Sequence, residues 1–113
     1  VFGWGRCDKG QLGTERTENV STPTRLFGSH KVQSVACGSE STVVVNEAGD
    51  LWSCGWNEHG NLASGGDKDS YALSKAIGAP ITITPGYPRE CRVTIAAGGA
   101  HLLAMKVPKF RST

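Results

Sequence analysis

The chain has 113 residues and a formal net charge of +2, with 38% hydrophobic and 19% charged residues. This charge is too small to indicate a nucleic-acid or membrane surface, and no apolar run reaches the roughly 18 residues of a membrane span. The 15 glycines lie between short β-branched runs and indicate an all-β fold, because glycine supplies turns that other residues resist.

Short strand-like runs follow one another along the chain, and helical periodicity is nearly absent. Turn residues such as those at 47–50 and 98–99 separate the runs. Residues 67–79 are the hardest to assign, and residues 71–77 are compatible with a helical turn or an ordered loop. The predicted strands lie at 1–4, 32–37, 42–46, 51–54, 81–84, 93–97 and 102–107.

Two stretches of the sequence recur. Residues 34–38 match residues 94–98 at an offset of 60, and the ten additional residues are expected within 67–79. Periods of 50 to 60 residues in an all-β chain indicate propeller blades. At an offset of 50, Gly5, Asp8, Gly10 and Leu12 recur as Gly55, Glu58, Gly60 and Leu62.

These repeats resemble those of the regulator-of-chromosome-condensation family. The family unit contains Trp-Gly-x-Asn-x-x-Gly-Gln-Leu-Gly, followed by Pro-x-x-Val/Leu on an outer strand. Residues 4–13 fit this unit except that Cys7 replaces the asparagine, and residues 23–26 fit the outer strand. Residues 55–60 fit in the second copy, and His101 matches the histidine that the family carries after its inner-strand glycine. The departures are Ser41, Cys54, Asn61 and Ala63.

The resemblance implies a partial β-propeller with one complete four-stranded antiparallel blade flanked by two half-blades. Residues 1–30 would hold the outer strands of a first blade. Residues 31–84 would form the complete blade, with its fourth strand near 80–84, and residues 85–113 the inner strands of a third blade and a tail. Because a blade buries its faces against its neighbours, we expect the chain to be a piece of a longer protein and marginal or aggregation-prone alone.

The polar and thiol residues form no recognisable catalytic motif. The four cysteines lack a C-x-x-C pair, and the three histidines lack an H-E-x-x-H run. No glycine-rich phosphate loop or G-x-S-x-G elbow occurs. We therefore predict no enzyme activity, no cofactor and no metal. Four cysteines could form two disulfides. Three of them lie in or beside apolar runs, however, where a thiol behaves as a small buried apolar group, and this favours a reducing compartment, the cytoplasm or the nucleus.

We predict a partner-binding loop at Trp56, Asn57, Glu58 and His59. Trp56 follows the glycine that ends a strand, and tryptophan is enriched at protein interfaces. Internal packing is the alternative for Trp56, and a solvated loop position is the alternative for His59.

Within the family these residues look most like the secretion-regulating guanine nucleotide exchange factors. The resemblance implies an interaction propeller that binds a small GTPase or a secretory-tethering component and no nucleic acid or membrane. The alternative is a non-catalytic scaffold of the fungal type that partners a small zinc protein in tRNA or translation-factor modification. Photoreception is not expected, because Ser39 and Gly99 stand where the plant UV-B photoreceptor of this family has tryptophans.

Overall fold

The structure is a computed structural model that describes residues 1–28, 30–76 and 91–108. These residues form eight β-strands and no helix. The strands are β1 (Phe2–Gly5), β2 (Val20–Arg25), β3 (Val32–Cys37), β4 (Ser41–Asn46), β5 (Leu51–Gly55), β6 (Ser70–Lys75), β7 (Cys91–Gly98) and β8 (His101–Pro108).

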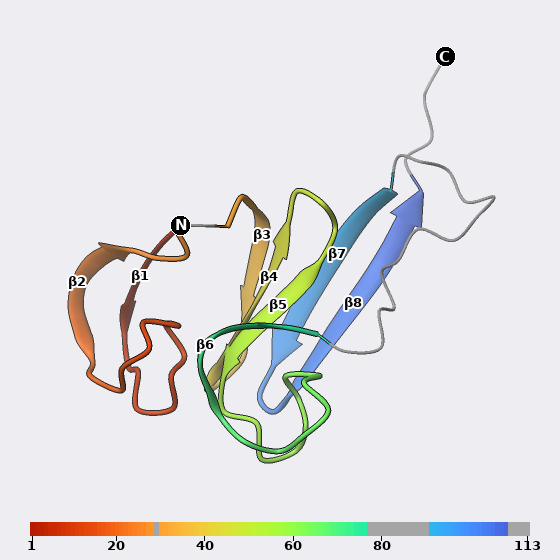
Figure 1. Cartoon of the computed structure of the whole chain (residues 1–113). Coiled ribbons are helices and arrows are strands. Elements are labelled where there is room, and N and C mark those ends of the chain that lie inside the picture. The colour runs from red at the N-terminus through yellow and green to blue at the C-terminus, as the bar shows by residue number, and fades with distance from the viewer. Residues whose placement is uncertain (29, 77–90, 109–113) are drawn as a thin grey trace.

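The eight strands form three antiparallel sheets with the orders β1-β2, β3-β4-β5-β6 and β7-β8. Figure 1 shows the four-stranded sheet between the two smaller ones. Sequential strands joined by short turns and stacked sheet beside sheet are the architecture of propeller blades. This confirms the predicted partial propeller, with one complete blade between two half-blades.

The blades repeat in register as well as in sequence. The β1–β2 pairing matches the β5–β6 pairing at the offset of 50, and both contain an irregularity at the same place. The β3–β4 pairing matches the β7–β8 pairing at the offset of 60. Matching pairs are Gly3–Thr24 with Ser53–Ser74, Gly5–Val20 with Gly55–Ser70, and Val35–Val44 with Ile95–Ala104. We call such residues structural counterparts.

The fourth strand of the complete blade lies earlier than the sequence indicated. The prediction near 80–84 was wrong for this role, because β6 (Ser70–Lys75) pairs with β5, and residues 80–84 lie outside the described residues. Most of residues 71–77 are therefore strand, not helical turn or loop. The offset of 50 holds to Lys75, so the ten additional residues lie beyond it. The division at residues 30 and 84 stays a proposal.

Buried apolar residues lie in two places. In the first half-blade Cys7, Leu12 and Leu26 form a cluster, and a second group lies where the complete blade is covered on both sides. β4 contributes Val43, Val44 and Val45, all buried, because β4 is a central strand with blades on both faces. On one side, the Oγ1 of Thr42 and the Sγ of Cys54 donate hydrogen bonds to the Gln11 carbonyl of the first half-blade, at 2.7 and 3.3 Å. On the other side, β7 packs against β3 and β4.

Candidate protein-binding face

Four connections meet at one end of the molecule, which we call the loop face. It comprises residues 6–19, 38–40, 56–69 and 99–100, which follow β1, β3, β5 and β7. β3 and β5 end at the same edge because each is antiparallel to β4. The connections join at the lower edge of Figure 1, where Ser39 N donates to Gly99 O at 3.2 Å and Trp56 N donates to Glu40 O at 2.9 Å.

The four residues predicted to bind a partner divide into two groups on the loop face. Glu58 and His59 are exposed, and Trp56 is half-buried beside them. The Trp56 and His59 rings meet edge to face, with centroids 5.0 Å apart and planes at 85°. Such a pair gives an aromatic anchor with a polar rim, which suits a protein contact. Asn57 is buried and belongs to the interior of the loop.

Asn57 holds the loop together through its side chain. Its Nδ2 donates to Ser64 Oγ at 3.0 Å, Gly66 O at 3.1 Å and Lys68 O at 2.9 Å. Its Oδ1 accepts from Leu62 N at 2.9 Å. These bonds use both N–H groups of the amide, and the side chain is fully buried, so a partner cannot reach it. The repeated asparagine of the family unit was the sequence signal for this role.

Cys7, the structural counterpart of Asn57, sits in a loop of the same shape. The backbone N of Cys7 donates to Asn19 Oδ1 at 3.0 Å, just as Asn57 N donates to Asp69 Oδ1 at 2.9 Å. The Cys7 Sγ lies 3.4 Å from Arg16 O. Because a thiol is a weak donor, this contact is weaker than the hydrogen bonds that the Asn57 amide makes. The loop conformation is therefore set by the repeat, and Asn57 reinforces it.

An ionic cluster that no sequence pattern predicted lies beside these loops. Arg6 makes a bidentate pair with Asp8, with both N–O distances at 2.7 Å, and its Nη2 lies 3.3 Å from Glu40 Oε1. The hydrogen bonds from Arg6 lower the pKa of Asp8 to about 2. Glu40 gave no sequence signal because it reaches Arg6 only through the packing of neighbouring blades. The loop face thus carries charges of both signs.

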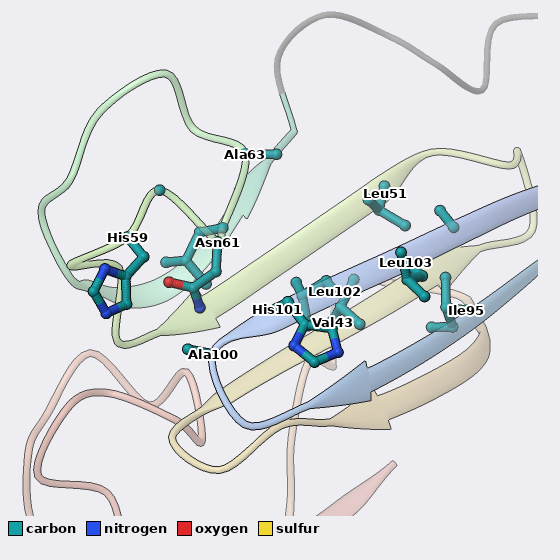
Figure 2. A pocket seen from close by; sticks show the side chains of 13 residues that line it. Val43, Leu51, His59, Asn61, Ala63, Ile95, Ala100, His101, Leu102 and Leu103 are labelled. Carbon is teal, nitrogen blue, oxygen red and sulfur yellow. The ribbon is translucent and has the colours of Figure 1, made fainter.

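A hollow of about 390 Å³ opens between the loop after β5 and the β7–β8 hairpin. Figure 2 shows His59 and Asn61 on the loop side and His101 and Leu102 on the hairpin side. Its wall is mainly apolar and holds no arrangement of acid, base and nucleophile.

The titratable residues of the described ranges meet the needs of neither metal binding nor thiol chemistry. In the described part of the chain, no cluster of three or more His, Cys, Asp or Glu side chains could hold a metal ion. Cys7, Cys37 and Cys54 are free thiols, and burial raises the pKa of Cys54 to about 12, which makes it a poor nucleophile. No helix among the described residues is long and apolar enough to cross a membrane.

Stacked antiparallel sheets with the same loop repeated at one end define a segment of a β-propeller. Residues 1–45 match a family model described as the regulator of chromosome condensation (RCC1) repeat, and residues 32–61 match a second model of that repeat. The two matches together span residues 1–61, more than half of the chain. The chain belongs to the RCC1 repeat family.

Three curated relatives match between 73% and 93% of the chain. It is 34% identical over 107 residues to the Arabidopsis thaliana ultraviolet-B receptor UVR8, covering 93% of this chain and 22% of the relative. It is 38% identical to human protein RCC2, covering 73% and 17%. It is 35% identical to the Bos taurus secretion-regulating guanine nucleotide exchange factor, covering 92% and 21%. The chain thus spans about a fifth of the length of these relatives.

Solved structures agree on the fold. Prp20p from Saccharomyces cerevisiae superposes with a TM-score of 0.70 at 21% identity, over 97% of this chain and 27% of that one. Human WBSCR16 superposes with a TM-score of 0.67 at 27% identity, over 93% and 27%.

Proposed function

We propose that this chain is part of a protein-interaction propeller that regulates a small GTPase in the manner of a guanine nucleotide exchange factor. The partner would bind the loop face, with Trp56, Glu58 and His59 among the contacts. Exchange would come from tighter binding of one state of the GTPase, without covalent chemistry on this chain. A cytoplasmic or nuclear location and the lack of a nucleic-acid partner stay predictions.

One observation carries the proposal: exposed Glu58 and His59, with half-buried Trp56 beside them, lie on a loop that buried hydrogen bonds hold in place. Asn57 fixes the loop from inside, so Trp56 and His59 are presented with little conformational freedom to lose on binding. Support from relatives comes from the bovine exchange factor, and from Prp20p, whose structure is described together with its binding properties to Gsp1p and histones.

The test uses the complete parent propeller and the release of a fluorescent guanine nucleotide from a panel of small GTPases. We expect acceleration with one GTPase, and a loss of at least tenfold in that acceleration in the double variant Trp56→Ala, His59→Ala. Glu47→Ala is the matched control, because Glu47 is exposed in the β4–β5 turn at the opposite end of the blade.

Two results would reject the proposal. The first is no acceleration with any GTPase of the panel. The second is an equal loss of acceleration in the Glu47→Ala control, because the effect would then not be specific to the loop face. Capture of a small zinc protein by a propeller without exchange activity would favour the scaffold function instead.

A further inference from the structure

The two long loops of the loop face present different side chains from the same repeat positions. Arg6 and Asp8 follow β1, and their structural counterparts Trp56 and Glu58 follow β5. In the first loop the ion pair is complete within the chain, because Arg6 donates two hydrogen bonds of 2.7 Å to Asp8. In the second loop a tryptophan replaces the arginine, and Glu58 makes no ion pair with any described residue. The repeat therefore holds a guanidinium group in one loop and leaves the carboxylate of the other loop without a cation.

The backbone of the two loops agrees where these side chains leave it. Gly5 and Gly55, the residues directly before Arg6 and Trp56, have φ angles of 107° and 110°, a region that favours glycine. The turn that follows is also shared, since the carbonyl oxygen of residue 7 or 57 accepts a hydrogen bond from the N–H three residues later, at 3.0 and 2.9 Å. The side chains at 56 and 58 therefore leave the second loop in the directions that Arg6 and its partner take in the first.

The neighbouring turn that reaches this position is described for both loops. Beside the first loop, the turn after β3 brings Glu40 Oε1 within 3.3 Å of Arg6 Nη2. Beside the second loop, the equivalent turn after β7 carries Ala100 in place of Glu40. Ala100 and His59 line the hollow of Figure 2 together, so this turn does lie next to the second loop. The lack of a cation at Glu58 thus follows from the residue types at positions 56 and 100.

We propose that the partner supplies the missing group, and that an arginine side chain of the partner protein binds between Trp56 and Glu58. The subsite belongs to the loop face and rests on the proposed function for its partner being a protein. Glu58 would accept two parallel hydrogen bonds from the guanidinium group, as Asp8 does from Arg6, because the two groups match in a bidentate pair. The indole face of Trp56 would stack on the guanidinium plane, where the cation is attracted to the π-system.

The charge of the second loop suits a cationic group. Residues 6–19 carry three acidic and three basic residues, whereas residues 56–69 carry three acidic residues and one lysine. Opposite charge across an interface speeds the encounter and selects the partner. Arginine fits this subsite better than lysine, because the lysine ammonium is a point charge that cannot make a bidentate pair with Glu58 or stack as a plane on Trp56.

Trp56 is held in place for such a contact. Its backbone N–H donates to Glu40 O at 2.9 Å, and its carbonyl oxygen accepts from Asn61 Nδ2 at 2.9 Å. The His59 ring meets the indole edge to face, and the indole is only half-buried, so part of its surface stays open to a partner. A guanidinium group between the indole and Glu58 is partly shielded from water, which strengthens its ion pair relative to the exposed pair of the first loop.

The first test follows the Trp56 indole by fluorine NMR in the complete parent propeller labelled with fluorotryptophan. The probes are N-acetyl-arginine amide and N-acetyl-lysine amide, and the Trp56 signal is identified by its loss in Trp56→Phe. We expect a saturable shift of this signal with the arginine probe, and binding of the lysine probe that is weaker by about threefold or more. An unshifted Trp56 signal overturns the proposal, and equal binding of the two probes overturns the assignment to a guanidinium group.

Two carboxylate variants separate Glu58 from its counterpart. Glu58→Gln keeps the size of the side chain and removes its charge, so we expect binding of the arginine probe to weaken by about fivefold or more. Asp8→Asn is the matched control at the same position of the first loop, and it should leave the Trp56 response unchanged because Asp8 pairs with Arg6. A Trp56 response that survives Glu58→Gln, or that falls equally in Asp8→Asn, contradicts the proposal.

A reciprocal variant transfers the subsite to the first loop. Arg6→Trp gives this loop the tryptophan and carboxylate of the second loop and leaves Asp8 and Glu40 without their cation. We expect a new fluorotryptophan signal that shifts with the arginine probe, and a new signal without this response would show that the two positions are not equivalent and overturn the proposal. All these shifts are measured without a GTPase, so a propeller that lacks exchange activity but binds the arginine probe would reject only the proposed function.

Discussion

The complete blade and the half-blades follow the same sequence pattern and differ in what surrounds each strand. In the complete blade, β4 has a strand on either side and a blade on either face, and its valines are buried. In the half-blade, β8 has the same register against its neighbour, yet Leu103 and Met105 are exposed. Burial in a propeller is therefore a property of neighbouring strands and blades, and local sequence sets only the strand.

The largest difference between the two regions should appear when a leucine is truncated in each. Leu62→Ala truncates a fully buried side chain in the loop after β5 of the complete blade. We expect a loss of about 3 kcal/mol in the free energy of unfolding. Leu103→Ala, its matched control on the half-blade, should change this free energy by less than about 0.5 kcal/mol. Urea unfolding followed by tryptophan fluorescence, at a concentration where the chain is monomeric, measures both. Equal losses would contradict the comparison.

A smaller loss is expected for Asn57→Ala. The substitution leaves Leu62 N and the carbonyls of Gly66 and Lys68 without their partner inside the loop, and we expect a cost of about 2 kcal/mol. Cys7→Ala removes only weak sulfur contacts in the counterpart loop and should cost less. The same urea experiment checks the order, and a larger loss for Cys7→Ala would show that the two loops are not held as described.

Cys7→Asn should make the half-blade loop more like that of the complete blade. The backbone around Cys7 already matches that around Asn57, with Gly10 N donating to Cys7 O at 3.0 Å and Gly60 N donating to Asn57 O at 2.9 Å. The new amide would reach the counterparts of the Asn57 partners, among them the N of Leu12 and the O of Arg16. We expect a gain of about 1 kcal/mol in the free energy of unfolding. A loss would mean that the buried site has no room for the amide.

The smallest expected effect concerns the pKa of Asp8 and is measured by NMR titration. The pKa of Asp8 is about 2 in the folded chain, below its unfolded value of roughly 3.9, because Arg6 donates two hydrogen bonds to it. Its contribution to stability is therefore present above about pH 4 and is lost as the pH falls toward 2. NMR titration of the carboxyl group should show the pKa rising toward its unfolded value in Arg6→Gln. An unchanged pKa would mean that Arg6 is not the cause.

The sequence by itself determined the repeat, the all-β class and the repeated loop, because glycine turns and the spacing of apolar residues are local features. The sequence predicted that Trp56 and His59 follow the end of a strand, and in the structure both lie on the loop after β5. Only the tertiary structure decided that Ser70–Lys75 is the fourth strand, since a half-exposed strand with no alternating pattern is defined by its pairing with β5. Tertiary contacts likewise buried Asn57 and brought Arg6 to Glu40, because each outcome depends on residues far apart in the chain.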